Sequence, residues 1–250
     1  MSGKLVAIAN SKGGVGKTTT CVSLAEAFAA EGRKVLVVDL DMQANASLLV
    51  FGHGGDERLY EAISMEKTLK HYLEDNFFGD RRVPLGDVAI ARASDVTFRG
   101  RALDISLVAS TPGLRRVERE LIYELTAQGF AMQAIEKRVG NRLRHDFDRL
   151  RSAFDVMLCD CPPGISAMTE AVLTAADLIL VPTIPDFMST LGLDLFAGDV
   201  MAQLAERGVT RKPVVMATRY SGSPHQQIVL NAMRDGARGA DVPYEMLDTI

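Results

Sequence analysis

Residues 10–20, which read NSKGGVGKTTT, decide the fold of this chain. They follow an apolar run (KLVAIAN, 4–10) and lead into a longer run (TTTCVSLAEAFAAEG, 18–32) that predicts a helix. Glycines allow backbone N–H groups to turn toward one point, and a helix N-terminus favours an anion there. The turn therefore predicts a phosphate cradle, in which Lys17 reaches the β- and γ-phosphates and the Thr18 hydroxyl is a ligand of Mg²⁺.

This turn departs from the ordinary phosphate-binding loop. The pattern G-x-x-x-x-G-K-[ST] requires glycine at position 11, where this chain has Ser11, and Lys12 follows as a second lysine. The alternative interpretation of Lys12 is a solvated side chain at the edge of a loop, and that of Lys17 is an incidental lysine in a structural turn. The residues predicted to hold the nucleotide are Lys12, Gly13, Gly14, Val15, Gly16, Lys17, Thr18 and Thr19.

Short apolar runs alternate with longer amphipathic stretches along the whole chain, as in strands joined by helical crossovers. The predicted strands are 4–10, 34–41, 103–110, 154–160, 177–183, 213–219 and, last, 241–250. Because these runs are apolar on both alternating faces, they predict a doubly wound α/β fold, a mostly parallel sheet with helices on both faces.

The predicted organisation is one domain, 1–250, with an insertion at about 50–103. The insertion is more polar and carries one expected helix around 69–76. A sheet of this kind normally has a helix covering its last strand. Because the sequence stops on an apparent strand, we expect that the C-terminus is truncated or that a further tail follows.

Composition fits a single domain in a reducing compartment. The chain has 250 residues, of which 47% are hydrophobic, enough to bury a sizeable core. Its formal net charge of -4 excludes a globally basic nucleic-acid coat but is compatible with a local basic face. Cys21, Cys159 and Cys161 are an odd number without zinc-type pairs, and the N-terminus has no signal-peptide pattern. We expect a soluble, cytoplasmic protein without disulfides.

Three aspartates are predicted to serve the same site. Asp39 and Asp41 end the run 34–41, at the carboxyl edge where open α/β sheets bind ligands. The period of two along a strand places both carboxylates on one side, although a solvated strand end is the alternative. Asp160 follows the apolar run VMLC in the Walker B arrangement, which predicts a carboxylate bonded to a magnesium-bound water.

Five segments together resemble the ParA/MinD family of deviant Walker ATPases, and in particular its ParA-type partition and positioning members. The segments, in family order, are KGGVGKTTT (12–20), VDLDMQANAS (38–47), LVASTPGL (107–114), CDCPPG (159–164) and AADLILVPTIPDFMSTLGL (175–193). The resemblance implies ATP and Mg²⁺ as cofactors and hydrolysis of ATP to ADP and phosphate, slow alone and stimulated by a partner protein. The residues implied around the metal are Thr18, Asp39, Asp41 and Asp160, the aspartates through water.

The resemblance also implies a role for the second lysine. In the family it reaches across a dimer interface to the nucleotide of the other subunit. Two ATP molecules held between subunits bring several negative charges together, and a cation supplied in trans would offset that repulsion. Lys12 would thus couple ATP to homodimer formation. By the same resemblance Asp41 positions the attacking water, Asp39 supports the Mg²⁺ shell, and Asn45 lies in the adjoining switch region.

The function implied is that of a positioning switch. ATP-bound homodimers would bind nucleoid DNA without sequence preference, and an activating partner or cargo adaptor would trigger hydrolysis and release. A plasmid, a chromosome region or a protein cargo would be positioned in this way. The candidate DNA-binding residues are Arg211, Lys212, Arg219, Arg234 and Arg238, with solvated surface charges as the alternative interpretation.

Two other classes of function compete with this one. A MinD-like membrane switch would need a C-terminal amphipathic helix, which the sequence does not show before its end. An ATP-using metabolic enzyme or reductase would need a substrate domain or cluster cysteines. Cys159 and Cys161 flank Asp160, but no cysteine lies between them and Cys21 upstream, so packing on a buried strand is the better interpretation. We therefore expect no membrane association and a cytoplasmic, nucleoid-associated protein.

Overall fold

The computed structural model describes residues 2–79, 81–127, 129, 131–164, 166–206, 208–237 and 244–247. Seven strands form the main sheet, and their order across it is β5-β2-β6-β1-β7-β8-β9. They are β1 (Lys4–Ile8), β2 (Val35–Asp39), β5 (Ile105–Val108), β6 (Val156–Asp160), β7 (Leu178–Thr183), β8 (Val214–Ala217) and β9 (Glu245–Met246). Every neighbouring pair is parallel, so the doubly wound α/β fold predicted from the sequence is confirmed.

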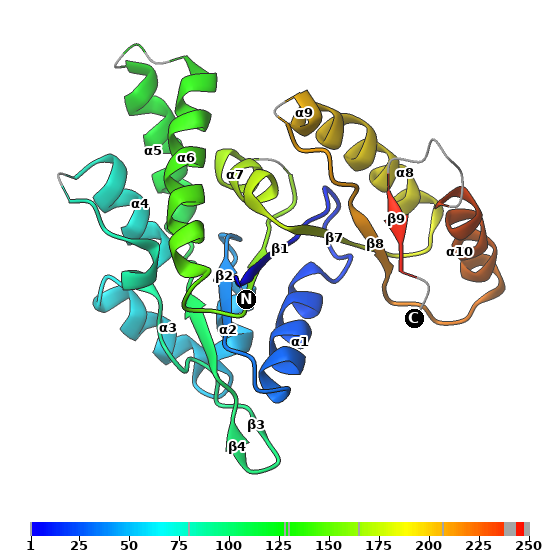
Figure 1. Cartoon of the computed structure of the whole chain (residues 1–250), viewed down its shortest axis with the longest axis horizontal. Helices are drawn as coiled ribbons and strands as arrows, with labels where there is room; N and C mark the ends of the chain where they lie inside the picture. Colours follow the sequence, from blue (N-terminus) through cyan, green and yellow to red (C-terminus); the bar gives the residue numbers. More distant parts are fainter. Residues whose placement is uncertain are drawn as a thin grey trace.

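Helices cover both faces of the sheet (Figure 1). They are α1 (Lys17–Ala30), α2 (Asn45–Phe51), α3 (Gly55–Ser64), α4 (Leu69–Phe77), α5 (Leu114–Ala127), α6 (Met132–Leu150), α7 (Ala167–Ala175), α8 (Phe187–Leu195), α9 (Met201–Glu206) and α10 (Pro224–Ala237). A 3₁₀ turn, η1 (Leu85–Val88), precedes β5, and a π-helical turn, η2 (Phe196–Val200), joins α8 to α9.

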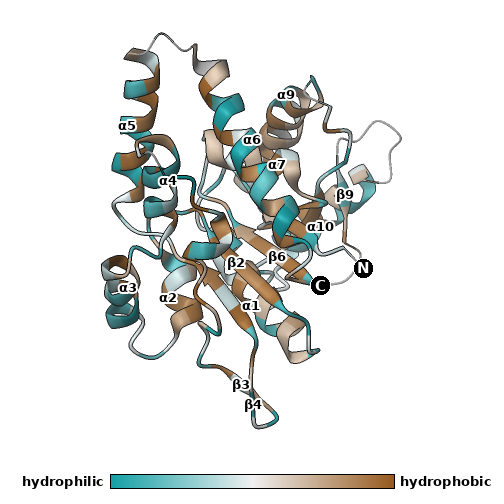
Figure 2. Ribbon diagram, turned by 60° about the vertical axis from the view of Figure 1, so that its left-hand side comes forward, coloured by the Kyte–Doolittle hydropathy of each residue, from teal (hydrophilic) through white to brown (hydrophobic). Residues whose placement is uncertain are grey.

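The two faces of the sheet belong to two apolar clusters. Along β1, Val6 and Ile8 pack with α1, α2 and α3, whereas Leu5 and Ala7 pack with α4 to α9. This is the alternation that the pleat of a strand imposes. Figure 2 shows the strands β2 and β6 in brown between helices that carry teal stretches. Apolar side chains on both faces explain why the strands read as nearly continuous hydrophobic runs.

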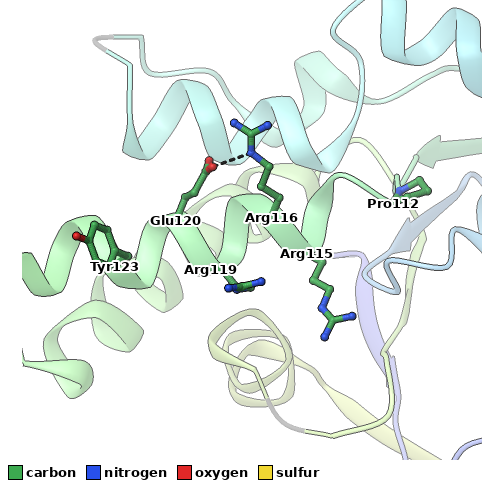
Figure 3. Close-up of a pocket in the computed structure, with 6 residues that line it drawn as sticks. All are labelled: Pro112, Arg115, Arg116, Arg119, Glu120 and Tyr123. Carbon is green, nitrogen blue, oxygen red and sulfur yellow. Dashed lines mark hydrogen bonds and ion pairs between the residues drawn. The ribbon is translucent and has the colours of Figure 1, made fainter.

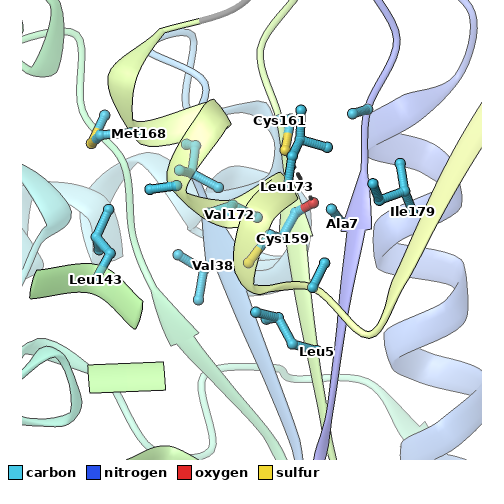
Figure 4. Close-up of a cluster of buried hydrophobic side chains, with 14 of the residues drawn as sticks. Leu5, Ala7, Val38, Leu143, Cys159, Cys161, Met168, Val172, Leu173 and Ile179 are labelled. Atoms are coloured by element: carbon cyan, nitrogen blue, oxygen red, sulfur yellow. Dashed lines mark hydrogen bonds between the residues drawn. The ribbon is translucent and has the colours of Figure 1, made fainter. Parts of the chain in front are cut away.

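The three cysteines are buried and unpaired. Cys159 and Cys161 lie in the cluster on the α7 side of the sheet, among side chains such as Leu5, Val172 and Ile179 (Figure 4). Burial raises the pKa of the Cys159 and Cys161 thiols. Both therefore act as packing residues of a buried strand, as the sequence predicted.

Residues 50–103 form small elements packed along the β5 edge of the sheet. Besides α3, α4 and η1 they include a hairpin of β3 (Thr97–Phe98) and β4 (Arg101–Ala102). The helix expected around 69–76 is α4. Its Tyr72 hydroxyl donates to the buried Asp146 of α6 at 2.9 Å, which ties this segment to the body of the domain. Among the described residues, no helix combines the length and apolar character needed to cross a bilayer.

Candidate nucleotide site

The phosphate loop connects the end of β1 to the start of α1, at the carboxyl edge of the central strand. Gly14 (φ 75°) and Gly16 (φ 89°) adopt the left-handed backbone conformation on either side of Val15. Residues other than glycine rarely adopt such backbone angles. No described side chain caps the first turn of α1. The uncapped N–H groups at this end suit an anion.

A cavity of about 640 Å³ opens beside the loop. Its lining residues are Gly13, Gly14, Gly16, Lys17, Thr18, Thr19, Thr20, Asp41, Asn45, Pro163, Thr218 and Arg219. Most of the predicted nucleotide residues are thus brought together in one place. Lys12 and Val15, which were also predicted, do not line it. Val15 is fully buried, and the Lys12 side chain contacts α8.

Lys17 is the buried cation of the site. Its side chain lies at the first residue of α1, and the ammonium donates to the Lys12 carbonyl at 2.9 Å across the loop. Burial lowers the pKa of Lys17, whereas the nearby carboxylates of Asp160 and Asp41 oppose this change. Among the described residues the ammonium donates to the loop's own carbonyl alone, so it is well placed to exchange that contact for a phosphate oxygen.

Lys12 rests on the start of α8. Its ammonium donates to the Ser189 hydroxyl at 2.8 Å and lies 3.5 Å from Asp186 Oδ1. Asp186 is also the N-cap of α8, because it accepts a hydrogen bond from the Ser189 backbone N–H at 2.7 Å. Sequence reasoning missed both partners. The spacing D-x-x-S before a helix signals a cap, but it gives no sign of a contact with a loop 177 residues away.

Thr18 and Asp160 form the candidate magnesium site. The Thr18 hydroxyl donates to Asp160 Oδ2 at 2.7 Å, and Asp160 Oδ1 is buried without a hydrogen-bond partner among the described residues. Burial raises the pKa of Asp160 to about 8, and the charge of Asp39, its register partner on β2, adds to the effect. A hydroxyl beside a buried carboxylate with an unused oxygen matches the oxygen donors that Mg²⁺ prefers. The residues therefore fit the predicted ion.

Asp39 and Asp41 differ in burial and in hydrogen-bond partners. β2 ends at Asp39, which is fully buried, and only Asp41 lines the cavity. Asp39 Oδ1 accepts the Asp41 backbone N–H at 3.0 Å, and Oδ2 accepts the Ser47 N–H and hydroxyl at 2.8 and 2.6 Å. Asp39 continues the alternation of Val35 and Val37, which face α1 and α2, and Asp41 lines a cavity walled by residues of the same two helices, so both carboxylates lie on one side of the sheet. A role for Asp39 near Mg²⁺ stays a prediction, and sequence reasoning missed its partner Ser47.

The candidate DNA-binding residues do not gather in one place. Arg219 lines the nucleotide cavity, and Arg211 donates to the Thr174 carbonyl at 2.7 Å. Lys212 is exposed at the amino end of β8, on the edge of the sheet opposite the cavity, and Arg234 lies on α10. Arg238 lies outside the described residues. A DNA contact by any of them stays a prediction.

A second hollow, of about 580 Å³, lies along α5. It is lined by Pro112, Arg115, Arg116, Arg119, Glu120 and Tyr123. Arg116 Nε pairs with Glu120 at 2.6 Å, while Arg115 and Arg119 project to the other side of the helix (Figure 3). No motif in the sequence indicates this surface.

Fold and loop together define a phosphate-loop nucleotide-binding protein. A family model described as an AAA domain matches residues 3–207. The chain is 29% identical over 192 residues to the sporulation initiation inhibitor protein Soj of Bacillus subtilis, and 30% identical over 199 residues to the chromosome partitioning protein ParA of Caulobacter vibrioides. The chain therefore belongs to this AAA-domain family, and its resemblance to the ParA-type ATPases is confirmed.

Both matches cover 76% of this chain but only 62% of Soj and 59% of the Caulobacter protein. Solved structures with the same fold include cobyrinic acid a,c-diamide synthase of Mycobacterium smegmatis with a bound ATP analogue and magnesium. It has a TM-score of 0.65 and 24% identity, over 93% of this chain and 80% of that one. A plasmid partition protein of Borrelia burgdorferi has a TM-score of 0.65 and 17% identity, over 97% and 88%. At such identities the structures establish the fold alone, which serves both a biosynthetic enzyme and a partition protein.

Proposed function

We propose that this protein is an ATP-dependent switch that binds Mg²⁺-ATP, forms a homodimer in that state, and returns to the monomer after hydrolysis to ADP and phosphate. The observation that carries the proposal is the contact between Thr18 and Asp160 at the mouth of the phosphate loop, with an unused Asp160 oxygen. Thr18 would bind the ion directly and Asp160 through water. When bound, Mg²⁺ would neutralise charge on the phosphates.

Asp41 is the residue we assign to hydrolysis. It is the acidic side chain lining the cavity, and its Oδ1 accepts the Gln43 backbone N–H at 2.9 Å, whereas both oxygens of Asp39 accept hydrogen bonds. A carboxylate there can hold and orient the attacking water. The expected turnover is slow alone and faster with an activating partner, as in the family resemblance.

Lys12 is the residue we assign to the dimer. In the single chain its ammonium is held by Ser189 and Asp186 on α8, outside the cavity of its own subunit. The Lys12 ammonium therefore does not contact the nucleotide cavity of its own subunit and can bind a nucleotide held by another subunit. A second subunit carrying ATP would offer it phosphate oxygens, which bind an ammonium more strongly than a hydroxyl does.

We propose further that the ATP-bound dimer binds DNA without sequence preference and positions a cargo in the cytoplasm near the nucleoid. The names of the relatives support this, since those of Soj and ParA concern sporulation control and chromosome partitioning. With a net charge of -4, one chain attracts DNA weakly, whereas a dimer doubles each basic contact. DNA binding should therefore follow ATP binding.

The test is a gel shift on two unrelated DNA duplexes with ATP and with ADP. We expect a shift with ATP alone, on both duplexes, and an affinity that falls steeply with salt because Lys and Arg release counterions from DNA. Lys212→Glu should weaken binding and lower the salt slope. Lys34→Glu is the matched control, since Lys34 is an exposed lysine at the same edge of the sheet, directly before β2 in the other half.

DNA binding that does not depend on the nucleotide or on the salt concentration would contradict this part of the proposal. ATP-dependent binding to anionic liposomes in place of DNA would favour the MinD-like alternative.

A further inference from the structure

The turn that follows β8 lies against the outside of the phosphate loop. The Thr218 hydroxyl donates to the Val15 carbonyl at 2.7 Å, and Arg219 Nη1 donates to the Gly14 carbonyl at 3.1 Å. Two consecutive residues thus bond two consecutive carbonyls more than 200 positions away. The turn is itself anchored, because the Thr218 backbone N–H donates to Thr183 at the end of β7 at 2.9 Å.

These contacts fix two peptide planes of the loop. In a planar trans peptide the carbonyl and the next residue's N–H point in opposite directions. Holding the carbonyls of Gly14 and Val15 therefore also sets the directions of the N–H groups of Val15 and Gly16. Left-handed glycines on either side of Val15 give the backbone shape of an anion-binding nest, which works only when its N–H groups converge.

Two more features associate Arg219 with the nucleotide site. Its backbone has φ 52°, a left-handed angle that costs energy for a side chain of this kind and persists only where the surroundings impose it. Its side chain lines the nucleotide cavity. A guanidinium has five N–H donors, so the bond to Gly14 leaves others to meet an anionic oxygen.

We propose that Thr218 and Arg219 form a clamp that holds the phosphate loop in its nucleotide-binding shape, and that Arg219 also contacts the phosphate chain of the bound nucleotide. This inference rests on the proposed function, since it concerns the same nucleotide site. It assigns Arg219 to the nucleotide and removes it from the DNA-binding candidates.

The test is calorimetric titration of Mg²⁺-ATP into four variants in the absence of DNA. Thr218→Val has the same shape but no hydroxyl, and we expect about fivefold weaker binding, the effect of one neutral hydrogen bond. Thr218→Ser keeps the hydroxyl and should bind within about twofold of the parent. Arg219→Gln should weaken binding about tenfold, because a charged donor is lost. Lys34→Gln, which removes an exposed positive charge at the opposite edge of the sheet, should leave ATP affinity unchanged.

Thermal unfolding without nucleotide checks that each variant folds. If Thr218→Val does not fold, the comparison of Arg219→Gln with Lys34→Gln still decides. Parent-like ATP affinity in Thr218→Val and Arg219→Gln, together with loss of affinity in Lys17→Ala, would overturn the clamp and leave the proposed function standing. Parent-like affinity in Lys17→Ala would overturn the nucleotide site, and the clamp with it.

Discussion

At the scale of single residues, the site depends on a lysine and a threonine that begin α1. Lys17 is 7% exposed and donates to the loop, and Thr18 contacts the unsatisfied carboxylate of Asp160. Lys17→Ala removes the cation and Thr18→Ala removes the metal ligand. We expect each to weaken Mg²⁺-ATP binding at least about a hundredfold, or about 2.7 kcal/mol, in calorimetry. Affinity within about twofold of the parent in either variant would show that the site lies elsewhere.

Asp41 should behave differently from these two, because it acts on water and not on phosphate. Asp41→Ala is expected to bind Mg²⁺-ATP within about twofold of the parent and to turn over about a hundredfold more slowly. Measured ATPase rates and affinities separate the two effects. The product should be a dimer that persists with ATP. If hydrolysis is unchanged, Asp41 has a structural role only.

Some residues of the site could be predicted from the sequence, and the contacts of others could not. Lys17, Thr18 and Asp160 could be predicted because each sits at a fixed offset from a strand or helix end. Asp39 was expected beside Asp41, and only the structure shows that Ser47 donates to the Asp39 carboxylate while Asp41 lines the cavity. Arg219 was expected on a DNA-binding face, because no local pattern announces a bond to Gly14, 205 positions away.

At the scale of elements, α8 is the helix that holds the second lysine. Asp186 caps it and faces Lys12, and both side chains are 35% exposed. Burial raises the pKa of Asp186, but the Ser189 hydrogen bonds and the Lys12 charge outweigh it and lower that pKa overall. If Lys12 must leave α8 to reach a second subunit, this ion pair opposes dimer formation.

Asp186→Asn should therefore strengthen ATP-dependent dimerisation. Asparagine still caps a helix, so α8 should stay folded while the charge that holds Lys12 is lost. Exposed pairs contribute about 0.2–1 kcal/mol, so we expect tightening of up to about fivefold in sedimentation at low salt. The difference from the parent should shrink at high salt, which screens the pair. Weaker dimerisation in this variant would mean that Asp186 supports the dimer.

The strands of the main sheet could be predicted from the sequence, and the short hairpin of β3 and β4 could not. The longer strands are runs of apolar residues buried on both faces, which periodicity detects. The two-residue strands β3 and β4 depend on each other and carry no periodic signal, whereas β9, equally short, lies within the predicted run 241–250, of which the structure describes 244–247. Residues 50–103 are held by contacts such as Tyr72 to Asp146, which join distant parts of the chain. Such contacts are visible only in three dimensions.

At the scale of the whole molecule, the proposed switch needs a second copy of the chain to complete its site. Lys17, Thr18 and Asp41 line the cavity of one chain, whereas the Lys12 side chain lies outside it and contacts Ser189 of α8. Each chain carries a net charge of -4, so two chains repel one another overall. Dimerisation therefore needs local attraction, which the lysine and the nucleotide phosphates would supply. ATP should then be both the substrate and the condition for assembly.

The most direct test of ATP-dependent dimerisation through Lys12 is the molar mass in solution, measured by light scattering with ATP and with ADP. The measurement uses the parent, Lys12→Ala and, as a control for charge, Lys34→Ala. The parent and Lys34→Ala should double in mass with Mg²⁺-ATP and remain monomeric with ADP. Lys12→Ala should bind ATP in calorimetry yet keep the mass of one chain. A Lys12→Ala variant that doubles in mass with ATP as the parent does would contradict the account.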